Sequence, residues 1–178
     1  MKTVFLITGP PGCGKTTLVK EIARRFPGKV GGFYTEEVRR GGVREGFRIR
    51  TFDGESAFLA RVDLQSPWRV GKYGVDLRAL EEVGVPSIFR AIEGRRIVII
   101  DEIGKMELFS PRFVEAVWEA IGSGLPVVGT IMLKSHPEAD KVKAHPSVEL
   151  LLLRRGEGDR ILRKLLPEIS KLLQRGEP

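Results

Sequence analysis

The sequence predicts an α/β fold with a mostly parallel sheet, helices on both faces and an antiparallel hairpin extension at one edge. Apolar segments of strand length alternate with segments of helical periodicity along the chain, a pattern typical of strand–helix–strand units. A glycine-rich loop joins the first strand to the first helix, and two hairpin signals follow the second strand. At 178 residues the chain suits one domain with a sizeable core, so we expect residues 1–178 to form a single domain.

The loop at residues 9–16 reads Gly-Pro-Pro-Gly-Cys-Gly-Lys-Thr and directly follows the apolar segment 4–8. This is the complete G-x-x-x-x-G-K-S/T phosphate-binding motif in the strand-to-helix context that gives it meaning. Its backbone N–H groups and the start of the next helix favour an anion. Lys15 can reach the outer phosphates, and the Thr16 hydroxyl can bind Mg²⁺. The residues expected to contact the nucleotide are Gly9, Pro10, Pro11, Gly12, Cys13, Gly14, Lys15, Thr16 and Thr17.

The segment from 15 to 26 has helical periodicity, and Pro27-Gly28 ends it. Cys13 occupies a variable position of the loop, so we interpret it as filler rather than as a nucleophile. It is the only cysteine, which excludes a disulfide framework and favours a reducing, cytoplasmic setting. The chain begins almost directly with a strand, and no apolar run approaches the roughly 18 residues of a membrane span. We therefore expect no signal peptide and no membrane partner.

The region after the first helix predicts the extension. A strand at 31–38 is followed by a turn at 40–42 and by a half-exposed strand at 47–52, in which apolar and basic residues alternate. Asp53-Gly54 is a hairpin signal that leads into a strand near 57–62. Two consecutive hairpins favour an antiparallel extension at one edge of the sheet.

The segment 63–76 contains Gly and Pro, and we expect an irregular loop, which at this length is usually functional or mobile. The remaining elements alternate between helix and strand. They are a helix at 77–93 with a possible break at Pro86, a strand at 96–101, a helix at 111–121, a strand at 126–133, a short helix at 137–144, a strand at 148–153 and a closing amphipathic helix at 159–173. Right-handed crossovers then place a nucleotide beyond the carboxyl ends of the parallel strands.

A second chemical motif stands at the end of the apolar segment 97–100, where Asp101 and Glu102 follow. This is the Walker B pattern, in which the buried strand holds Asp101 beside the phosphate loop and lets it bind Mg²⁺ directly or through a water. Glu102 is then placed to orient or deprotonate a water that attacks the γ-phosphate, so Glu102 and Lys15 are the candidate catalytic residues. Two solvated acids at a strand end are common, but the phosphate loop favours the functional interpretation.

Residues 101–104 also spell D-x-x-G, a switch motif of signalling GTPases. This motif specifies only two of its four positions, so it is weak evidence for a GTPase. The chain contains no Asn, so the guanine-specificity element N/T-K-x-D is impossible in its usual form. We therefore expect no strict preference for guanine.

Four segments of the chain occur together in a characteristic order: 9–16, 32–38, 69–75 and 101–108, the last of which reads Asp-Glu-Ile-Gly-Lys-Met-Glu-Leu. This set resembles the thermophilic nucleoside-triphosphatase family, whose animal members are called cancer-related nucleoside-triphosphatase. The resemblance covers residues 1 to about 150, and no motif aligns firmly from Leu151 onward. It implies a three-layer P-loop NTPase fold of the RecA-like type. It also implies slow, Mg²⁺-dependent hydrolysis of ATP, GTP and other nucleoside triphosphates to the diphosphate and phosphate, with broad base specificity.

Phosphoryl transfer needs positive charge at the γ-phosphate. Candidates for that cation are Arg69, Lys72, Arg154 and Arg155, although a surface charge is the commoner role for each. Thr35-Glu36-Glu37 either lies near the γ-phosphate or simply ends a strand. Trp68 and Tyr73 either cover the base or pack under the long loop, and a bystander role is favoured for His136.

The formal net charge is +7, but basic residues are spread along the chain and interleaved with acids, and no aromatic-basic stripe stands out. Nucleic acid is therefore a possible partner that the sequence does not favour, and we expect a monomer. The absence of Asn together with abundant Arg and Glu suggests a thermophilic source. Three function classes remain open: a nucleoside-triphosphate hydrolase, a small-molecule or nucleotide kinase, and a nucleotide-dependent regulatory or RNA-associated module.

Overall fold

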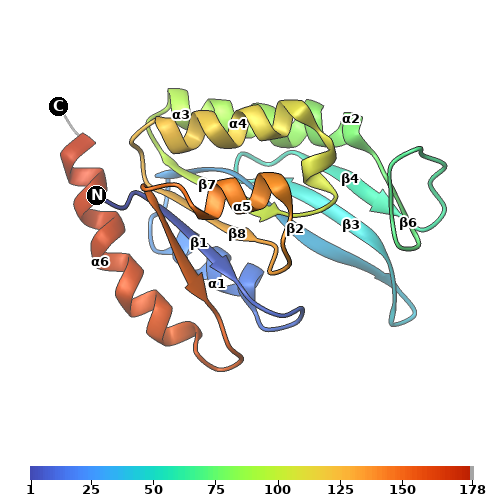
Figure 1. Ribbon diagram of the computed structural model, residues 1–178, viewed down its shortest axis with the longest axis horizontal. Helices are drawn as coiled ribbons and strands as arrows, with labels where there is room; N and C mark the ends of the chain where they lie inside the picture. The colour runs from blue at the N-terminus through green and yellow to red at the C-terminus, as the bar shows by residue number, and fades with distance from the viewer. Residues whose placement is uncertain (177–178) are drawn as a thin grey trace.

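A computed structural model describes residues 1–176, so the last two residues of the predicted domain 1–178 lie outside the described residues. Within residues 1–176, nine strands form one sheet in the order β5-β6-β4-β3-β2-β7-β8-β1-β9, with helices on its faces (Figure 1). The strands are β1 (Val4–Thr8), β2 (Val30–Arg40), β3 (Val43–Thr51), β4 (Ser56–Arg61), β5 (Arg69–Val70), β6 (Tyr73–Val75), β7 (Ile97–Ile103), β8 (Val127–Ile131) and β9 (Val148–Leu152). The α-helices are α1 (Lys15–Arg24), α2 (Leu77–Ala79), α3 (Val85–Glu93), α4 (Pro111–Gly122), α5 (Pro137–Lys143) and α6 (Gly158–Gly176).

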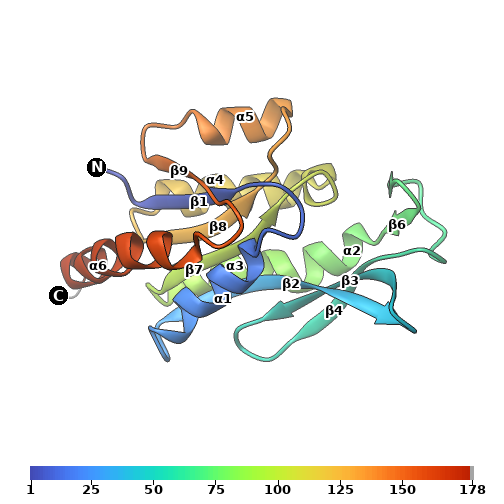
Figure 2. The same cartoon turned by 90° about the horizontal axis from the view of Figure 1, so that it is seen from below.

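Helices cover both faces of the sheet's core, which gives three layers (Figures 1 and 2). α1 and α6 pack on one face, against side chains that include Phe5 and Ile7. α3, α4 and α5 pack on the other face, against side chains that include Val4 and Leu6. Successive strand residues point to opposite faces, so β1 is buried at every position. The continuous apolar runs in β1 and at 97–100 therefore reflect burial from both sides.

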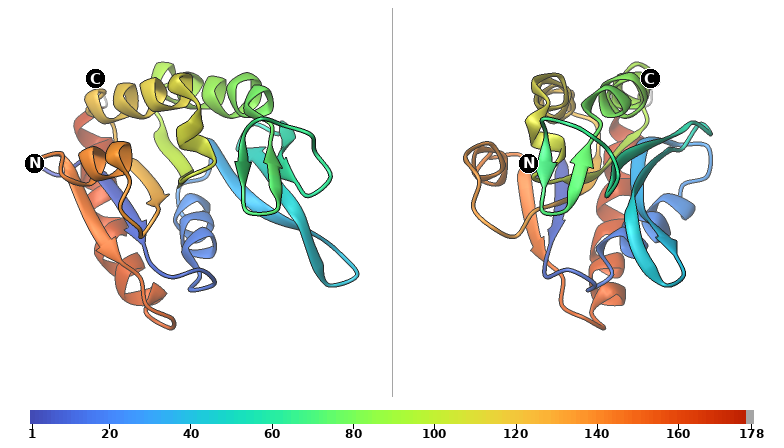
Figure 3. Two further views of the ribbon diagram at one scale, coloured as in Figure 1. Left: turned by 45° about the vertical axis from the view of Figure 1, so that its right-hand side comes forward. Right: turned by 90° about the vertical axis from the view of Figure 1, so that its right-hand side faces the viewer.

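The sheet combines a parallel core with an antiparallel extension, as the sequence predicts. β2, β7, β8, β1 and β9 run parallel, whereas β3, β4, β6 and β5 continue the sheet beyond β2 in antiparallel pairs. β2 belongs to both parts, because its first residues pair with β7 and its residues from Phe33 onward pair with β3. Figure 3 shows the extension reaching beyond the helical layers on one side of the molecule.

The segment 63–76 is more ordered than expected. It contains β5 and β6, which form a hairpin that adds the outermost strands to the extension. The Arg69 guanidinium donates hydrogen bonds to the carbonyl oxygens of Leu64 and Lys72, so the segment folds upon itself. The expectation of an irregular loop was wrong because strands of two and three residues are too short to show alternation.

The helix expected at 77–93 forms without a break at Pro86. It consists of α2, a π-helical turn at Leu80–Gly84 and α3, which follow one another directly. A regular α-helix would bring the proline ring against the carbonyl four residues earlier. The wider π-helical turn stands where that conflict would arise.

Most other boundaries agree with the prediction to within a few residues, with two differences near the motifs. β7 extends to Ile103, beyond the strand expected at 96–101, so Glu102 lies within the strand together with Asp101. A short 3-10 turn, Glu107–Phe109, follows β7 and was not expected. Within residues 1–176, no helix is both long and apolar enough to cross a membrane.

Candidate active site

The phosphate loop has the conformation that its glycines predict. Gly12 and Gly14 have φ angles of 74° and 95°, values that residues with a side chain rarely adopt. This turn starts α1 at Lys15, so the first N–H groups of the helix face the concave side of the loop. Lys15 Nζ donates hydrogen bonds to the carbonyl oxygens of Gly9 at 2.9 Å and Pro10 at 3.1 Å. The ammonium group is thus held over the loop itself.

The Asp101 carboxylate joins the two motifs. Its Oδ2 accepts a hydrogen bond from the Thr16 hydroxyl at 2.9 Å and one from the Thr35 N–H at 3.3 Å. Its Oδ1 accepts a hydrogen bond from the Thr130 hydroxyl at 2.6 Å. Asp101 is only 1% exposed. Burial raises its pKa above the ordinary value, and these donors together with Lys15 offset part of that rise.

Two further carboxyls, Glu102 and Glu107, lie next to Asp101. Burial, and then the charge of Asp101, raise the pKa of Glu102 above its ordinary value. A Cβ on Gly104 would lie 3.0 Å from Oε1 of Glu102 and 3.2 Å from Oε1 of Glu107, so both carboxyls flank this glycine. Burial, and then the charge of Glu102, raise the pKa of Glu107 well above 4.5. Three carboxyls therefore share a desolvated region, and burial is the largest cause of the raised pKa of each.

Two hollows border the phosphate loop and share no lining residue. The first, of about 450 Å³, is lined by Lys15, Glu102 and apolar side chains of the extension. The second, of about 290 Å³, is lined by Gly14 and Thr17 at the start of α1 and by leucines that include Leu153. A larger hollow of about 550 Å³ contains Met1 and residues of α6. It holds none of the predicted site residues, so we assign the site to the loop.

The predicted γ-phosphate cations do not line either hollow beside the loop. Arg69 stabilises its own segment, and the Lys72 ammonium lies 5.6 Å from the centre of the Tyr73 ring. Arg154 and Arg155 are exposed beyond the end of β9. Two lysines that the sequence did not single out, Lys105 and Lys134, line the 450 Å³ hollow together with Lys15.

Of the three residues 35–37, only Thr35 reaches the site. Its N–H binds Asp101, and it also lines the 450 Å³ hollow. Glu36 and Glu37 instead form ion pairs with arginines of the extension. Thr35 therefore fits the expectation of a place near the phosphates, whereas Glu36 and Glu37 fit the alternative of an ordinary strand.

The two aromatic candidates of the 63–76 segment pack within the protein. Trp68 lies against Phe109, with ring centroids 5.3 Å apart. Tyr73 is buried against Phe47, and its hydroxyl accepts a hydrogen bond from Arg44 Nε at 2.7 Å. Both side chains support the 63–76 segment and do not line the 290 Å³ hollow.

His136 has a local structural role. Its Nδ1 accepts a hydrogen bond from the Glu138 N–H at 3.2 Å and so caps the start of α5. This agrees with the bystander role that the sequence favours.

Besides Lys105 and Lys134, sequence reasoning missed Thr130 and Glu107 as residues of the site. Thr130 is a polar residue at the carboxyl end of the apolar strand β8, which neighbours β7. That position was a usable signal, because the carboxyl ends of adjacent parallel strands meet at one edge of the sheet. Glu107 gave no such signal, because an acid in a short turn is ordinarily solvated and nothing in the local pattern predicts its burial.

Comparisons with known proteins identify the family of the chain. A family model described as NTPase matches residues 4–166. The chain is 48% identical over 173 residues to the nucleoside-triphosphatase THEP1 of Thermotoga sp. (strain RQ2), an alignment that covers 97% of this chain and 98% of the relative.

Two solved structures share the fold. The crystal structure of THEP1 from the hyperthermophile Aquifex aeolicus superimposes with a TM-score of 0.86 at 39% identity, covering 96% of this chain and 99% of that one. The solution structure of a human cancer-related nucleoside triphosphatase gives a TM-score of 0.78 at 37% identity, with all of both chains covered. The predicted three-layer P-loop NTPase fold is therefore confirmed. The chain belongs to the nucleoside-triphosphatase family that its four motif segments resemble.

Proposed function

We propose that this chain hydrolyses nucleoside triphosphates to the diphosphate and phosphate with Mg²⁺ as its cofactor. The observation that carries the proposal is the junction of the two motifs, where Thr16 of the loop donates a hydrogen bond to Asp101 of β7 at 2.9 Å. Glu102, the next residue, lines the same hollow as Lys15. The relatives and the human structure bear the name of nucleoside-triphosphatase, which supports the same activity.

The donor set at this junction suits Mg²⁺. The Thr16 hydroxyl and the Asp101 carboxylate provide hard oxygen ligands, and Mg²⁺ usually binds one or two protein oxygens together with waters and substrate phosphates. The hydrogen bond between the two groups shows that their oxygens already converge. We propose that Thr16 and Asp101 hold the ion, which when bound neutralises charge on the β- and γ-phosphates.

The remaining residues of the site divide between binding and water activation. The backbone N–H groups from Gly9 to Thr17 cradle the phosphates, and Lys15 leaves its loop carbonyls to contact the outer phosphates. Glu102 orients the attacking water and accepts its proton. Lys105 and Lys134 provide the further positive charge at the γ-phosphate, because they line the hollow on that side of the loop.

We also propose that the nucleoside occupies the 290 Å³ hollow. In this motif the lysine faces the outer phosphates, so the nucleoside extends away from Lys15 along the start of α1. The hollow offers Leu18, Leu153 and Leu162 as apolar surface, which binds any base by stacking or burial. Such a surface supports hydrolysis of ATP, GTP and other nucleoside triphosphates at similar efficiency.

The proposed setting is a reducing cytoplasm in a thermophile, with the chain as a monomer. Cys13 is the only cysteine and the chain lacks Asn, and both features suit that setting. Size-exclusion chromatography with light scattering tests the oligomeric state, and a stable dimer would contradict this part of the proposal.

The decisive experiment is Glu102→Gln. We expect nucleotide binding to persist, because the phosphates contact the loop, and hydrolysis to fall by about 10²–10⁴-fold, because the amide cannot accept the proton. Phosphate release at high temperature and binding of a fluorescent ATP analogue provide the two measurements. The exposed Glu115→Gln is the matched control and should behave as the unmodified protein does.

Lys15→Ala completes the test. It should weaken nucleotide binding itself, since the loop then lacks the cation that contacts the outer phosphates. Glu102→Gln with ordinary turnover would refute the role of Glu102. Phosphate release that depends strictly on an added nucleoside or other hydroxyl acceptor would refute hydrolysis altogether and indicate a kinase.

A further inference from the structure

The 450 Å³ hollow is larger than a γ-phosphate and its attacking water require, and its lining is mainly apolar. The apolar side chains are Phe47, Leu59, Val70, Met106, Met132 and Leu133. Phe47, Leu59 and Val70 come from three different strands of the extension. Hollows of about 300–1,000 Å³ with apolar walls and a few polar groups are typical binding sites for small molecules. The extension thus builds one wall of a ligand-sized pocket.

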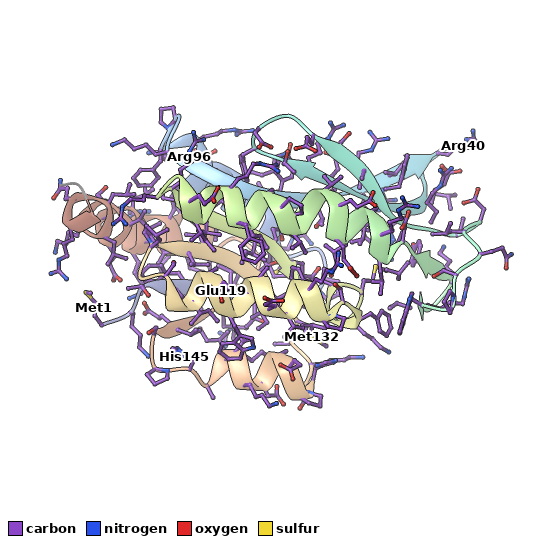
Figure 4. The ribbon with its side chains drawn as sticks, turned by 90° about the horizontal axis from the view of Figure 1, so that it is seen from above. Met1, Arg40, Arg96, Glu119, Met132 and His145 are labelled. Atoms are coloured by element: carbon purple, nitrogen blue, oxygen red, sulfur yellow. The ribbon has the colours of Figure 1, made fainter. Side chains whose placement is uncertain are left out.

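The nucleotide does not account for this pocket. Lys15 and Glu102 line it at the outer-phosphate end of the loop, whereas the nucleoside extends toward the separate 290 Å³ hollow. Figure 4 shows Met132 near the middle of the molecule's length, away from Met1 at one end. Methionine side chains adapt to differently shaped apolar partners. The apolar part of the pocket, beyond the γ-phosphate and its attacking water, is therefore available to a second molecule while a nucleotide is bound.

One polar group in the pocket wall has no side-chain partner. Glu107 is 4% exposed and lines the pocket. Within residues 1–176 its carboxyl forms no hydrogen bond to another side chain, and the only donor that stabilises it is its own backbone N–H. A carboxyl can accept several hydrogen bonds, so one backbone N–H leaves part of the acceptor capacity of Glu107 unused. A ligand that donates a hydrogen bond can use this remaining capacity.

We propose that this pocket binds a small, mainly apolar molecule that carries a hydroxyl or amino group, which donates a hydrogen bond to Glu107. A donor head group follows from the chemistry of a carboxyl, which accepts a hydrogen bond in both of its protonation states. A carboxylate head group has no proton to donate and is disfavoured beside Glu102 and Glu107. An apolar body of one ring suits the walls formed by the extension and the two methionines.

The test uses four probes with one body: 3-phenylpropan-1-ol, 3-phenylpropan-1-amine, 3-phenylpropanoate and propylbenzene. Saturation-transfer NMR titrations without nucleotide give their dissociation constants. We expect saturable binding of the alcohol and the amine at millimolar concentrations or below, and binding of the acid at least about tenfold weaker. Because no nucleotide is present, failure of this proposal and failure of the proposed hydrolysis are separate results.

Two variants locate the binding. Glu107→Met removes the acceptor while it keeps the length of the side chain, and it should weaken the alcohol and the amine about tenfold and leave propylbenzene within about twofold. Val70→Trp fills the pocket from β5 and should abolish binding of all probes. The matched controls are Glu115→Met and Val43→Trp, which replace exposed residues outside the pocket and should change nothing. Val70→Trp keeps the test decisive if Glu107→Met does not fold.

Several results would overturn the proposal. They are an absence of saturable binding by the alcohol and the amine, equal affinity for the acid, binding that survives Val70→Trp, and equal losses for propylbenzene and the alcohol in Glu107→Met. A fifth is a shift of the methyl signals of Met106 and Met132 with protein concentration alone, because a second copy of the chain would then occupy the pocket.

Discussion

At the scale of single residues, the site depends on how Asp101 is held. Its two oxygens accept hydrogen bonds from hydroxyls on α1 and β8 and from a backbone N–H on β2. Groups that hydrogen-bond a metal-binding carboxylate fix its orientation, and their loss typically costs 10–100-fold in metal affinity or activity. Thr130 is therefore a positioning residue of the proposed Mg²⁺ site.

We predict that Thr130→Val raises the Mg²⁺ concentration for half-maximal hydrolysis by about tenfold. The valine keeps the shape of the buried side chain but removes the 2.6 Å hydrogen bond to Asp101 Oδ1. The measurement is an Mg²⁺ titration of phosphate release at saturating ATP. Thr3→Val, at a buried position before β1, is the control and should leave the titration unchanged. An unaltered Mg²⁺ requirement in Thr130→Val would show that Asp101 needs no such support.

Glu107 gives a prediction about stability and pH. Burial raises the pKa of this carboxyl in the folded state well above 4.5, so between the unfolded and folded pKa values only the unfolded chain has lost the proton. The free energy of unfolding then falls as pH rises from about 4.5 through the folded pKa. Glu107→Gln removes this contribution, because an amide does not titrate. The melting temperature of the variant minus that of the unmodified protein should therefore increase with pH. A constant difference from pH 4 to pH 9 would contradict the buried, protonated carboxyl.

Sequence reasoning recovers residues whose chemistry is local. The phosphate loop and the pair Asp101-Glu102 are contiguous motifs, and the structure brings them within hydrogen-bond distance. Thr130, Lys105, Lys134 and Glu107 were not found, because their contribution depends on tertiary neighbours. The cations that were singled out, such as Arg69, were chosen from the sequence for their charge, and in the structure Arg69 stabilises its own segment.

At the scale of elements, long and strongly periodic segments were the best predicted. The closing helix, expected at 159–173, spans Gly158–Gly176 and buries Ile161, Leu165 and Ile169. The short strands β5 and β6 were missed because they are defined by their pairing, β6 with β4 and β5 with β6, rather than by their own pattern. The helix at 77–93 was predicted, but its π-helical turn was not, because that turn depends on local backbone geometry that composition does not encode.

The buried apolar face of α6 gives a prediction about the stability of the fold. Leu165 is fully buried between α6, α1 and the sheet, so Leu165→Ala should lower the free energy of unfolding by about 2–5 kcal/mol. The exposed Lys171→Ala on the same helix is the control and should stay within about 0.5 kcal/mol. Urea unfolding provides the measurement, with an unchanged slope expected for both. A loss below about 1 kcal/mol for Leu165→Ala would mean that α6 is not part of the cooperative core.

At the scale of the whole molecule, the antiparallel extension and the parallel core share one hydrophobic cluster. Ile49 and Leu59 of the extension belong to the same set of packed side chains as Ile88 and Phe113 of the core helices. β2 runs through both parts of the sheet, and Arg90 of α3 pairs with Asp53 in the β3–β4 turn. Nothing in this arrangement separates the extension as a unit of its own.

We therefore predict that the extension and the core unfold together. The chain contains two tryptophans, Trp68 in the extension and Trp118 on α4, so Trp68→Phe and Trp118→Phe each leave a single reporter for one part. In each variant the fluorescence midpoint in urea should coincide with the midpoint from far-ultraviolet circular dichroism, as a single cooperative transition requires. That comparison within one variant removes any effect of the substitution on stability. If Trp68 reports an earlier midpoint than the circular dichroism of the same protein, the extension unfolds by itself. The wall of the 450 Å³ pocket would then open while the phosphate loop stays intact.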